Sequence, residues 1–118
     1  MLAAMFSAAA DKAMVKAVVA RNLAFARRHA ARLLVSNVTQ DWRDVYGRIT
    51  VPTLVIGAGG GAFPPDAMRW QATQIPGARY AEIGADEGGS HLAFLENPAR
   101  FNEILAAFFA ACPVAHGG

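Results

Sequence analysis

Two short strand-like segments with one helix between them constrain the fold of this chain most strongly. Residues 51–56 form an apolar run with a proline near its start, as a buried strand tolerates, and residues 79–83 form a second short strand. Residues 64–75 open with two prolines, which suit the entry of a helix. A strand–helix–strand unit of this length predicts a parallel pair with a right-handed crossover.

Helices are predicted on both sides of this unit. Residues 3–36 are rich in Ala, Leu, Met and Arg, contain neither Pro nor Gly, and predict two or three short helices. Leu23, Arg27, Ala30, Ala31 and Leu34 mark one stripe along a helix there. Residues 41–49 predict a further short helix that Asp41 caps, and Asn97 with Pro98 predicts the start of the last helix. The apolar face of that last helix consists of Phe101, Ile104, Leu105, Phe108 and Phe109.

This pattern predicts an α/β fold with too few strands. Parallel sheets normally have both faces and most edges covered, and a two-stranded sheet is marginal by itself. We therefore expect the chain to form the end of a larger α/β sheet whose preceding strands lie outside it.

Composition indicates a folded chain of one domain at most. Of 118 residues, 54% are hydrophobic and 17% charged.

The longest apolar runs, such as residues 104–112, fall far short of the roughly 20 residues that span a bilayer. A lone cysteine, Cys112, excludes an internal disulfide, so we expect a cytoplasmic protein.

The basic residues are concentrated near the N-terminus. Residues 1–40 contain six Lys or Arg side chains and one acidic residue, Asp11. Such an asymmetry suits an anionic partner, but a basic helix face is more often merely solvated. We therefore expect neither nucleic acid nor a membrane as a partner.

The chemistry of the chain centres on His91. It ends the sequence Gly88-Gly89-Ser90-His91, which follows the second strand and precedes a helix. That context presents an imidazole at the rim of a parallel sheet, and imidazole, with an unperturbed pKa near 6.5, exchanges protons near neutral pH. The residues alone leave two interpretations open, a general base or a loop histidine with a structural role.

Several segments in this order resemble the C-terminal third of an α/β-hydrolase, closest to the esterase and cofactor-free haloperoxidase-like members. They are Asp41-Trp42-Arg43-Asp44, residues 49–57, residues 74–78, Gly88-Gly89-Ser90-His91, Glu96-Asn97-Pro98 and Phe101-Asn102. The resemblance covers residues 37–110, and it implies that His91 is the general base of a Ser-His-acid triad, with a small ester or related acyl compound as substrate and no cofactor.

The resemblance also implies a domain organisation. Residues 1–40 match a lid-like helical segment, residues 41–112 match the C-terminal part of the hydrolase core, and residues 113–118 form a flexible tail.

The nucleophile of such a triad is missing. It belongs in a G-x-S-x-G elbow on an earlier strand, and none of Ser7, Ser36 and Ser90 has that context. Ser90 adjoins His91, but neighbouring side chains in an extended loop point apart. Loss of the serine costs on the order of 10⁶-fold in turnover in subtilisin. We therefore expect the isolated chain to be inactive.

The acid is missing from its usual place as well. The resemblance puts it in the loop of residues 57–64, in a G-x-x-D pattern, and Gly60 stands at that position. Among the nearby carboxylates, we expect Asp66 to support a helix N-terminus, and Asp86 and Glu87 to face solvent. Without an orienting acid, a loss of roughly 10⁴-fold is expected by analogy with serine proteases.

Two other functions remain open. Gly57, Gly59 and Ala62 satisfy the dinucleotide-binding pattern G-x-G-x-x-G/A, although prolines stand where its helix should already run. The chain would otherwise be a non-enzymatic α/β interaction module, or a homodimer that pairs exposed strand edges.

The remaining candidates favour structural roles. We expect no catalytic part for His29 or His116, and no motif suggests a metal site. Trp42 and Trp70 are predicted to anchor the core.

Overall fold

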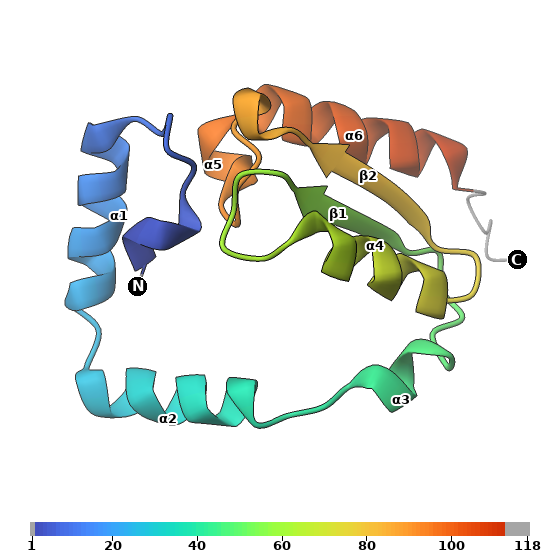
Figure 1. The fold of residues 1–118 in the computed structure, drawn as a ribbon, viewed down its shortest axis with the longest axis horizontal. Coiled ribbons are helices and arrows are strands. Elements are labelled where there is room, and N and C mark those ends of the chain that lie inside the picture. The colour runs from blue at the N-terminus through green and yellow to red at the C-terminus, as the bar shows by residue number, and fades with distance from the viewer. Residues whose placement is uncertain (1, 113–118) are drawn as a thin grey trace, which may run out of the picture.

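The fold is a mixed α/β arrangement, as expected. The computed structural model describes residues 2–112 (Figure 1), so that His116 and the predicted tail lie outside the described residues. Its elements are η1 Leu2–Met5, α1 Lys12–Leu23, α2 Arg27–Val38, α3 Arg43–Tyr46, β1 Leu54–Ala58, α4 Pro65–Gln74, β2 Arg79–Ile83, η2 Ala85–Glu87, α5 Ala93–Glu96 and α6 Pro98–Ala111, η marking a 3-10 helix.

The two strands pair in parallel, which confirms the prediction. Leu54 is opposite Arg79, and Ala58 is opposite Ile83. The second strand has the predicted bounds, but β1 begins three residues later than expected and extends through Ala58. The amide of Arg79 donates to the Thr53 carbonyl at 2.9 Å. The hydrogen bonds between the strands therefore begin at Arg79, the first residue of β2.

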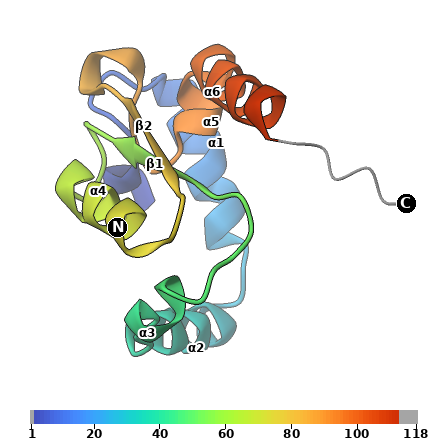
Figure 2. The same ribbon diagram turned by 90° about the vertical axis from the view of Figure 1, so that its right-hand side faces the viewer.

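Helices cover both faces of this narrow sheet. Figure 2 shows α4 on one side of the strands and α6 on the other. Val55 packs with Ala72 and Ile75 on the α4 side. On the α6 side, Ile83 packs with Ala93 and Ile104, and Ile83 is fully buried. Two small cores therefore flank the strands.

Helix α6 begins as the sequence predicts. Asn97 is its N-cap and accepts a hydrogen bond from the Arg100 amide at 3.1 Å, while Pro98 is the first helical residue. The expected apolar face is only partly buried, however. Ile104 is 8% exposed but Phe109 is 65% exposed, because a sheet of two strands is too narrow to cover the whole face.

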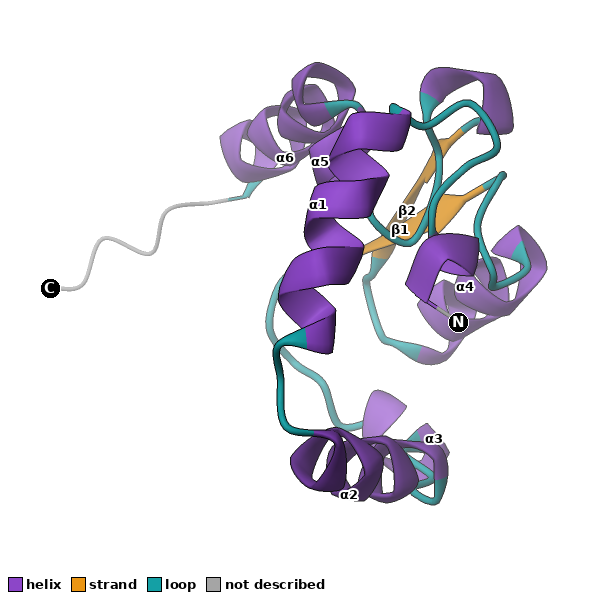
Figure 3. Cartoon of the chain, turned by 90° about the vertical axis from the view of Figure 1, so that its left-hand side faces the viewer, coloured by secondary structure: helices purple, strands orange, loops and turns teal. Residues whose placement is uncertain are grey.

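The N-terminal helices form where expected but bury no side chain. Figure 1 shows α1 at the margin of the molecule, with η1 and α5 between it and the strands, and Figure 3 shows α2 and α3 below the sheet. Neither α1 nor α2 contains a buried residue. The chain leaves the helix between Ala24 and Ala26, so Leu23 does not continue the stripe of α2 as predicted.

The predicted core role of the tryptophans is wrong. Trp42 is 56% exposed and Trp70 is 47% exposed. The Trp70 ring meets the Tyr46 ring edge-on, with 6.2 Å between ring centroids. Both indoles lie on elements that no further layer of the described chain covers.

Helix α3 is shorter than the predicted segment of residues 41–49. Trp42 is its N-cap residue, and Asp41, one position earlier, accepts a hydrogen bond from the Arg43 amide at 3.1 Å. Hydrogen bonds from the side chain and backbone of Arg43 lower the pKa of Asp41 to about 2.

Among residues 2–112, no helix combines the length and the apolar character needed to cross a bilayer.

Candidate active site at the carboxyl end of the strands

The loop that carries His91 depends on two glycines. Gly88 ends η2 with a φ of 76°, a left-handed conformation that glycine adopts without strain. The Gly89 amide donates to the Gly84 carbonyl at 2.8 Å, and a Cβ at Gly89 would overlap the backbone carbonyl of Ile83. These positions turn the chain sharply after β2, so that His91 follows at the carboxyl end of the sheet.

His91 lies at the rim of a cavity. Its side chain is exposed, and its ring lies against Phe63 with 5.3 Å between ring centroids. The cavity has a volume of about 270 Å³ and is mostly apolar. Its lining residues are Ile56, Ala58, Gly61, Phe63, Met68, Ser90, His91, Ala93, Phe94 and Phe101. A small apolar group can therefore approach the imidazole from this side.

Hydrogen bonds join the loops that follow the two strands. The Gly59 amide donates to the Ile83 carbonyl at 2.9 Å, and the Gly60 amide donates to the Gly89 carbonyl at 2.6 Å. In open parallel sheets, ligands bind in the crevice outside the carboxyl ends of the strands. The structure thus brings Gly60, the expected position of the acid, next to the loop of His91.

A side chain at position 60 would not point freely at the imidazole. A Cβ there would lie 2.9 Å from the Gly89 carbonyl oxygen and 3.2 Å from Ala85. A Cβ at Gly61 would lie 3.0 Å from the His91 amide nitrogen instead. The glycine loop is therefore packed against the histidine loop without room for an added carboxylate at Gly60.

The nearby carboxylates make other contacts. Asp66 lies in the first turn of α4, as expected. Its carboxylate forms an ion pair with Arg69 at 2.7 Å. Asp86 and Glu87 are exposed, also as expected. None of the ion pairs among residues 2–112 includes His91. No carboxylate of the described chain orients the imidazole through an ion pair.

The serines do not supply a nucleophile beside His91. Ser90 is 3% exposed and its hydroxyl oxygen accepts a hydrogen bond from the Leu92 amide at 3.0 Å, whereas the neighbouring His91 is exposed. The two side chains therefore point apart, as predicted. Ser36 lies exposed on α2, and the hydroxyl of Ser7 donates to Glu96.

Glu96 is a polar centre that the sequence did not reveal. It accepts hydrogen bonds from the amide and the hydroxyl of Ser7. Burial raises the pKa of Glu96, but hydrogen bonding by Ser7 and Ser90 lowers it more, so this pKa lies below its ordinary value. Sequence spacing gives no signal for such a contact, because 89 positions separate its two residues.

The glycine loop is not arranged to hold a pyrophosphate. The amides of Gly59 and Gly60 already donate to backbone carbonyls, and Gly57 lies within β1. A Cβ at Gly57 would collide with the Tyr80 hydroxyl, so this glycine allows close packing of the ring. The dinucleotide-binding pattern therefore matches residues with structural roles.

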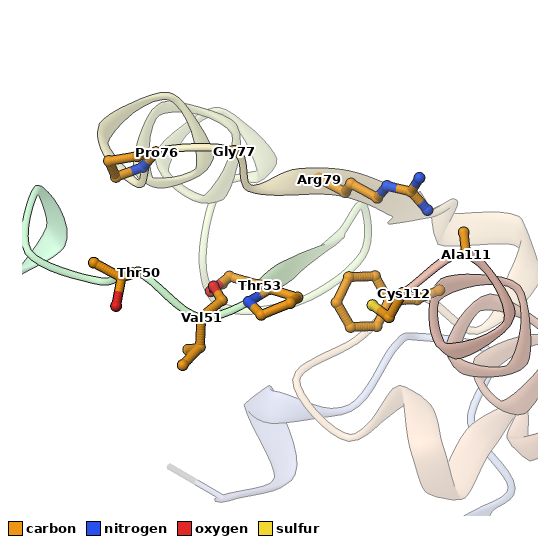
Figure 4. A pocket seen from close by; sticks show the side chains of 10 residues that line it. Thr50, Val51, Thr53, Pro76, Gly77, Arg79, Ala111 and Cys112 are labelled. Carbon is orange, nitrogen blue, oxygen red and sulfur yellow. The ribbon is translucent and has the colours of Figure 1, made fainter. Parts of the chain in front are cut away.

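Other parts of the described chain bring fewer reactive side chains together. A cavity of about 290 Å³ lies at the opposite, amino end of the strands, with Arg79 and the half-buried Cys112 on its wall (Figure 4). His29 is exposed on α2. No cluster of metal-ligating side chains occurs within residues 2–112.

Comparison with known proteins found no matching family model, no similar curated protein and no similar solved structure.

Proposed function

We propose that this chain is the C-terminal portion of a serine hydrolase acting on small esters or related acyl compounds, with His91 as the general base. The fold would be the end of an α/β-hydrolase sheet, with residues 1–40 as a lid-like helical segment. The observation that carries this proposal is the convergence of the two post-strand loops, with His91 exposed at the rim of an apolar cavity.

The imidazole of His91 has the access that a base needs. It is exposed to solvent on one side and contacts the Phe63 ring on the other, so a hydroxyl brought to the rim can reach a ring nitrogen. In the proposed reaction His91 takes the proton of a serine hydroxyl as that oxygen attacks the acyl carbon, and returns it to the leaving group. Backbone amides near the serine would stabilise the oxyanion.

The isolated chain would be inactive, because the serine belongs to polypeptide upstream of it and Gly60 stands at the usual position of the acid. Gly60 carries no carboxylate, and the space around it does not admit one without movement of the loop. No cofactor is needed for acyl transfer of this kind.

The decisive experiment starts with the coding sequence upstream of this chain. An in-frame stretch encoding G-x-S-x-G would be expressed together with the chain and assayed with p-nitrophenyl esters. We expect His91→Ala to lower turnover by about 10⁴-fold or more, and His29→Ala, at an exposed helix position, to leave it unchanged. Unchanged turnover in His91→Ala would remove the proposed base.

The isolated chain provides the complementary test. It should show neither ester turnover nor labelling by a fluorophosphonate, which reacts with activated serines. Specific labelling that is lost in His91→Ala would contradict the proposed inactivity. Absence of any upstream G-x-S-x-G stretch would contradict the hydrolase proposal and favour a non-enzymatic interaction module or homodimer.

A further inference from the structure

Helix α2 is unusual in this fold because every one of its residues is exposed. It runs along one margin of the molecule, apart from the sheet (Figure 1). Its large apolar side chains lie open to solvent: Leu33 is 64% exposed, Val35 59% and Val38 68%. A 12-residue helix without tertiary burial is marginal in water, so this surface is expected to have a partner.

Two rows of exposed side chains lie on different faces of α2. Ala30, Leu34 and Val38 follow one another at intervals of four residues and lie on one face of the helix. Arg28, Arg32 and Ser36 follow a second row at the same spacing and lie on another. Val35, three positions after Arg32, lies on the side of the second row, so α2 is amphipathic along these two rows only.

Aromatic residues stand at both ends of α2. Phe25, two positions before the helix, is 49% exposed, and Trp42, four positions after its last residue, is 56% exposed. Aromatic rings favour the boundary between hydrocarbon and water, where one part of the ring is apolar and the other wet.

The positive charges of α1 and α2 form no ion pairs with the described residues. Among the cations of residues 1–40, Arg27, Arg28 and Arg32 lie on α2 itself, and Lys12, Lys16 and Arg21 lie on α1. None of them forms an ion pair with any residue in the range 2–112. Asp11, the one acidic residue of this segment, accepts a hydrogen bond from the Met14 amide as the N-cap of α1. The surface is complementary in charge to an anionic partner.

We propose that α2 binds anionic lipid surfaces, lying parallel to the membrane plane. An amphipathic helix with Arg on its polar face and Leu, Phe or Trp on the other has the properties of an interfacial helix. Leu34 and Val38 enter the acyl boundary, while Arg28 and Arg32 reach the headgroups. Arg27, at the first position of α2 on the apolar side, extends its long side chain to the same level.

This proposal departs from the expectation that the basic residues are merely solvated. A solvated face accounts for the arginines, but it gives no account of the apolar stripe beside them. The proposal does not depend on the hydrolase activity. Its tests therefore use binding alone and can fail while the hydrolase proposal stands.

Trp42 provides the first readout. In a Trp70→Phe protein, its fluorescence should shift to the blue with vesicles of phosphatidylcholine and phosphatidylglycerol in equal parts, and stay unchanged with phosphatidylcholine alone. High salt should reverse the shift, because it screens the attraction. A Trp42→Phe protein, which keeps only Trp70 on α4, should show no shift. Equal binding to both kinds of vesicle, or binding to neither, would overturn the proposal.

Variants on α2 separate its two faces. Leu34→Gln with Val38→Gln should weaken sedimentation with anionic vesicles roughly ten-fold, while Ser36→Gln, on the second row, should leave it unchanged. Arg28→Gln with Arg32→Gln should weaken it about thirty-fold. Circular dichroism checks that each variant keeps its helices.

Two outcomes would assign the surface to another partner. If a DNA duplex binds more tightly than vesicles and only the arginine variants weaken it, α2 binds nucleic acid instead. If light scattering gives the mass of two chains and the Leu34–Val38 variant is monomeric, a second copy covers the stripe. Either result would contradict the lipid proposal.

Discussion

Ser7 and Glu96, 89 positions apart in the chain, are joined by two hydrogen bonds. The Ser7 amide donates to Oε1 of Glu96 at 2.8 Å, and its hydroxyl donates to Oε2. Next to this pair, the His91 amide donates to the Met5 carbonyl at 3.0 Å. The N-terminal segment is thereby fastened to the loop that carries the candidate base.

Replacement of Ser7 by alanine should loosen this attachment. Ser7→Ala removes a hydrogen bond to a half-buried carboxylate, which contributes about 2 kcal/mol to the free energy of unfolding. Urea unfolding measures the loss. Ser36→Ala, at an exposed site on α2, is the control and should change stability by less than about 0.5 kcal/mol. Equal effects of the two changes would contradict a stabilising role for the Ser7–Glu96 contact.

Glu96 should also make stability depend on pH. Because its pKa is lower in the folded chain than its ordinary value of 4.5, the folded state favours the charged carboxylate. This contribution is present above that ordinary value and is lost as pH falls through the lower folded value. Glu96→Gln should therefore flatten the decline of the unfolding free energy in acid. An unchanged pH profile would show that other carboxylates cause the decline.

Gly89 should tolerate no side chain. A Cβ there would overlap the backbone carbonyls of Ile83 and Gly84, so Gly89→Ala should cost about 3 kcal/mol or more. Gly47, which ends α3 with a helical φ of −66° and no atom near the position of a Cβ, is the control. Gly47→Ala should stabilise the chain by roughly 0.4–1 kcal/mol. Thermal unfolding compares them, and a harmless Gly89→Ala would mean that the His91 loop relaxes easily.

Two substitutions in α6 should show how much of its apolar face the two-stranded sheet covers. Ile104→Ala removes a buried side chain from the core around Ile83 and should cost about 2–4 kcal/mol. Phe109→Ala removes a larger side chain that is 65% exposed and should cost less than about 1 kcal/mol. Chemical denaturation ranks the two variants. A larger loss for Phe109→Ala would mean that another layer covers α6 in solution.

Local signals predicted the elements well where they involve neighbouring residues. Asn97 and Pro98 specify the start of α6 because the cap bonds an amide only three positions away. The bounds of β2 and the parallel pairing with β1 also followed from the sequence, since a helix between two strands leaves few topologies.

Burial was predicted less well. The periodic apolar positions of α6 and the two tryptophans suggested a larger core than the chain contains. Periodicity reports that a helix has an apolar face, but the area of the opposing layer decides how much of that face is covered. With two strands in the sheet, Phe109, Trp42 and Trp70 remain largely exposed.

The sequence by itself determined the order of the elements, the position of His91 after β2 and the glycines that turn its loop, because these depend on short-range backbone preferences. Only the tertiary structure decided that Gly60 bonds the loop of His91, that Ser7 holds Glu96, and that α2 lies uncovered. These features join residues distant in the chain, or depend on the number of layers present. Their free energy comes from contacts that no local pattern encodes.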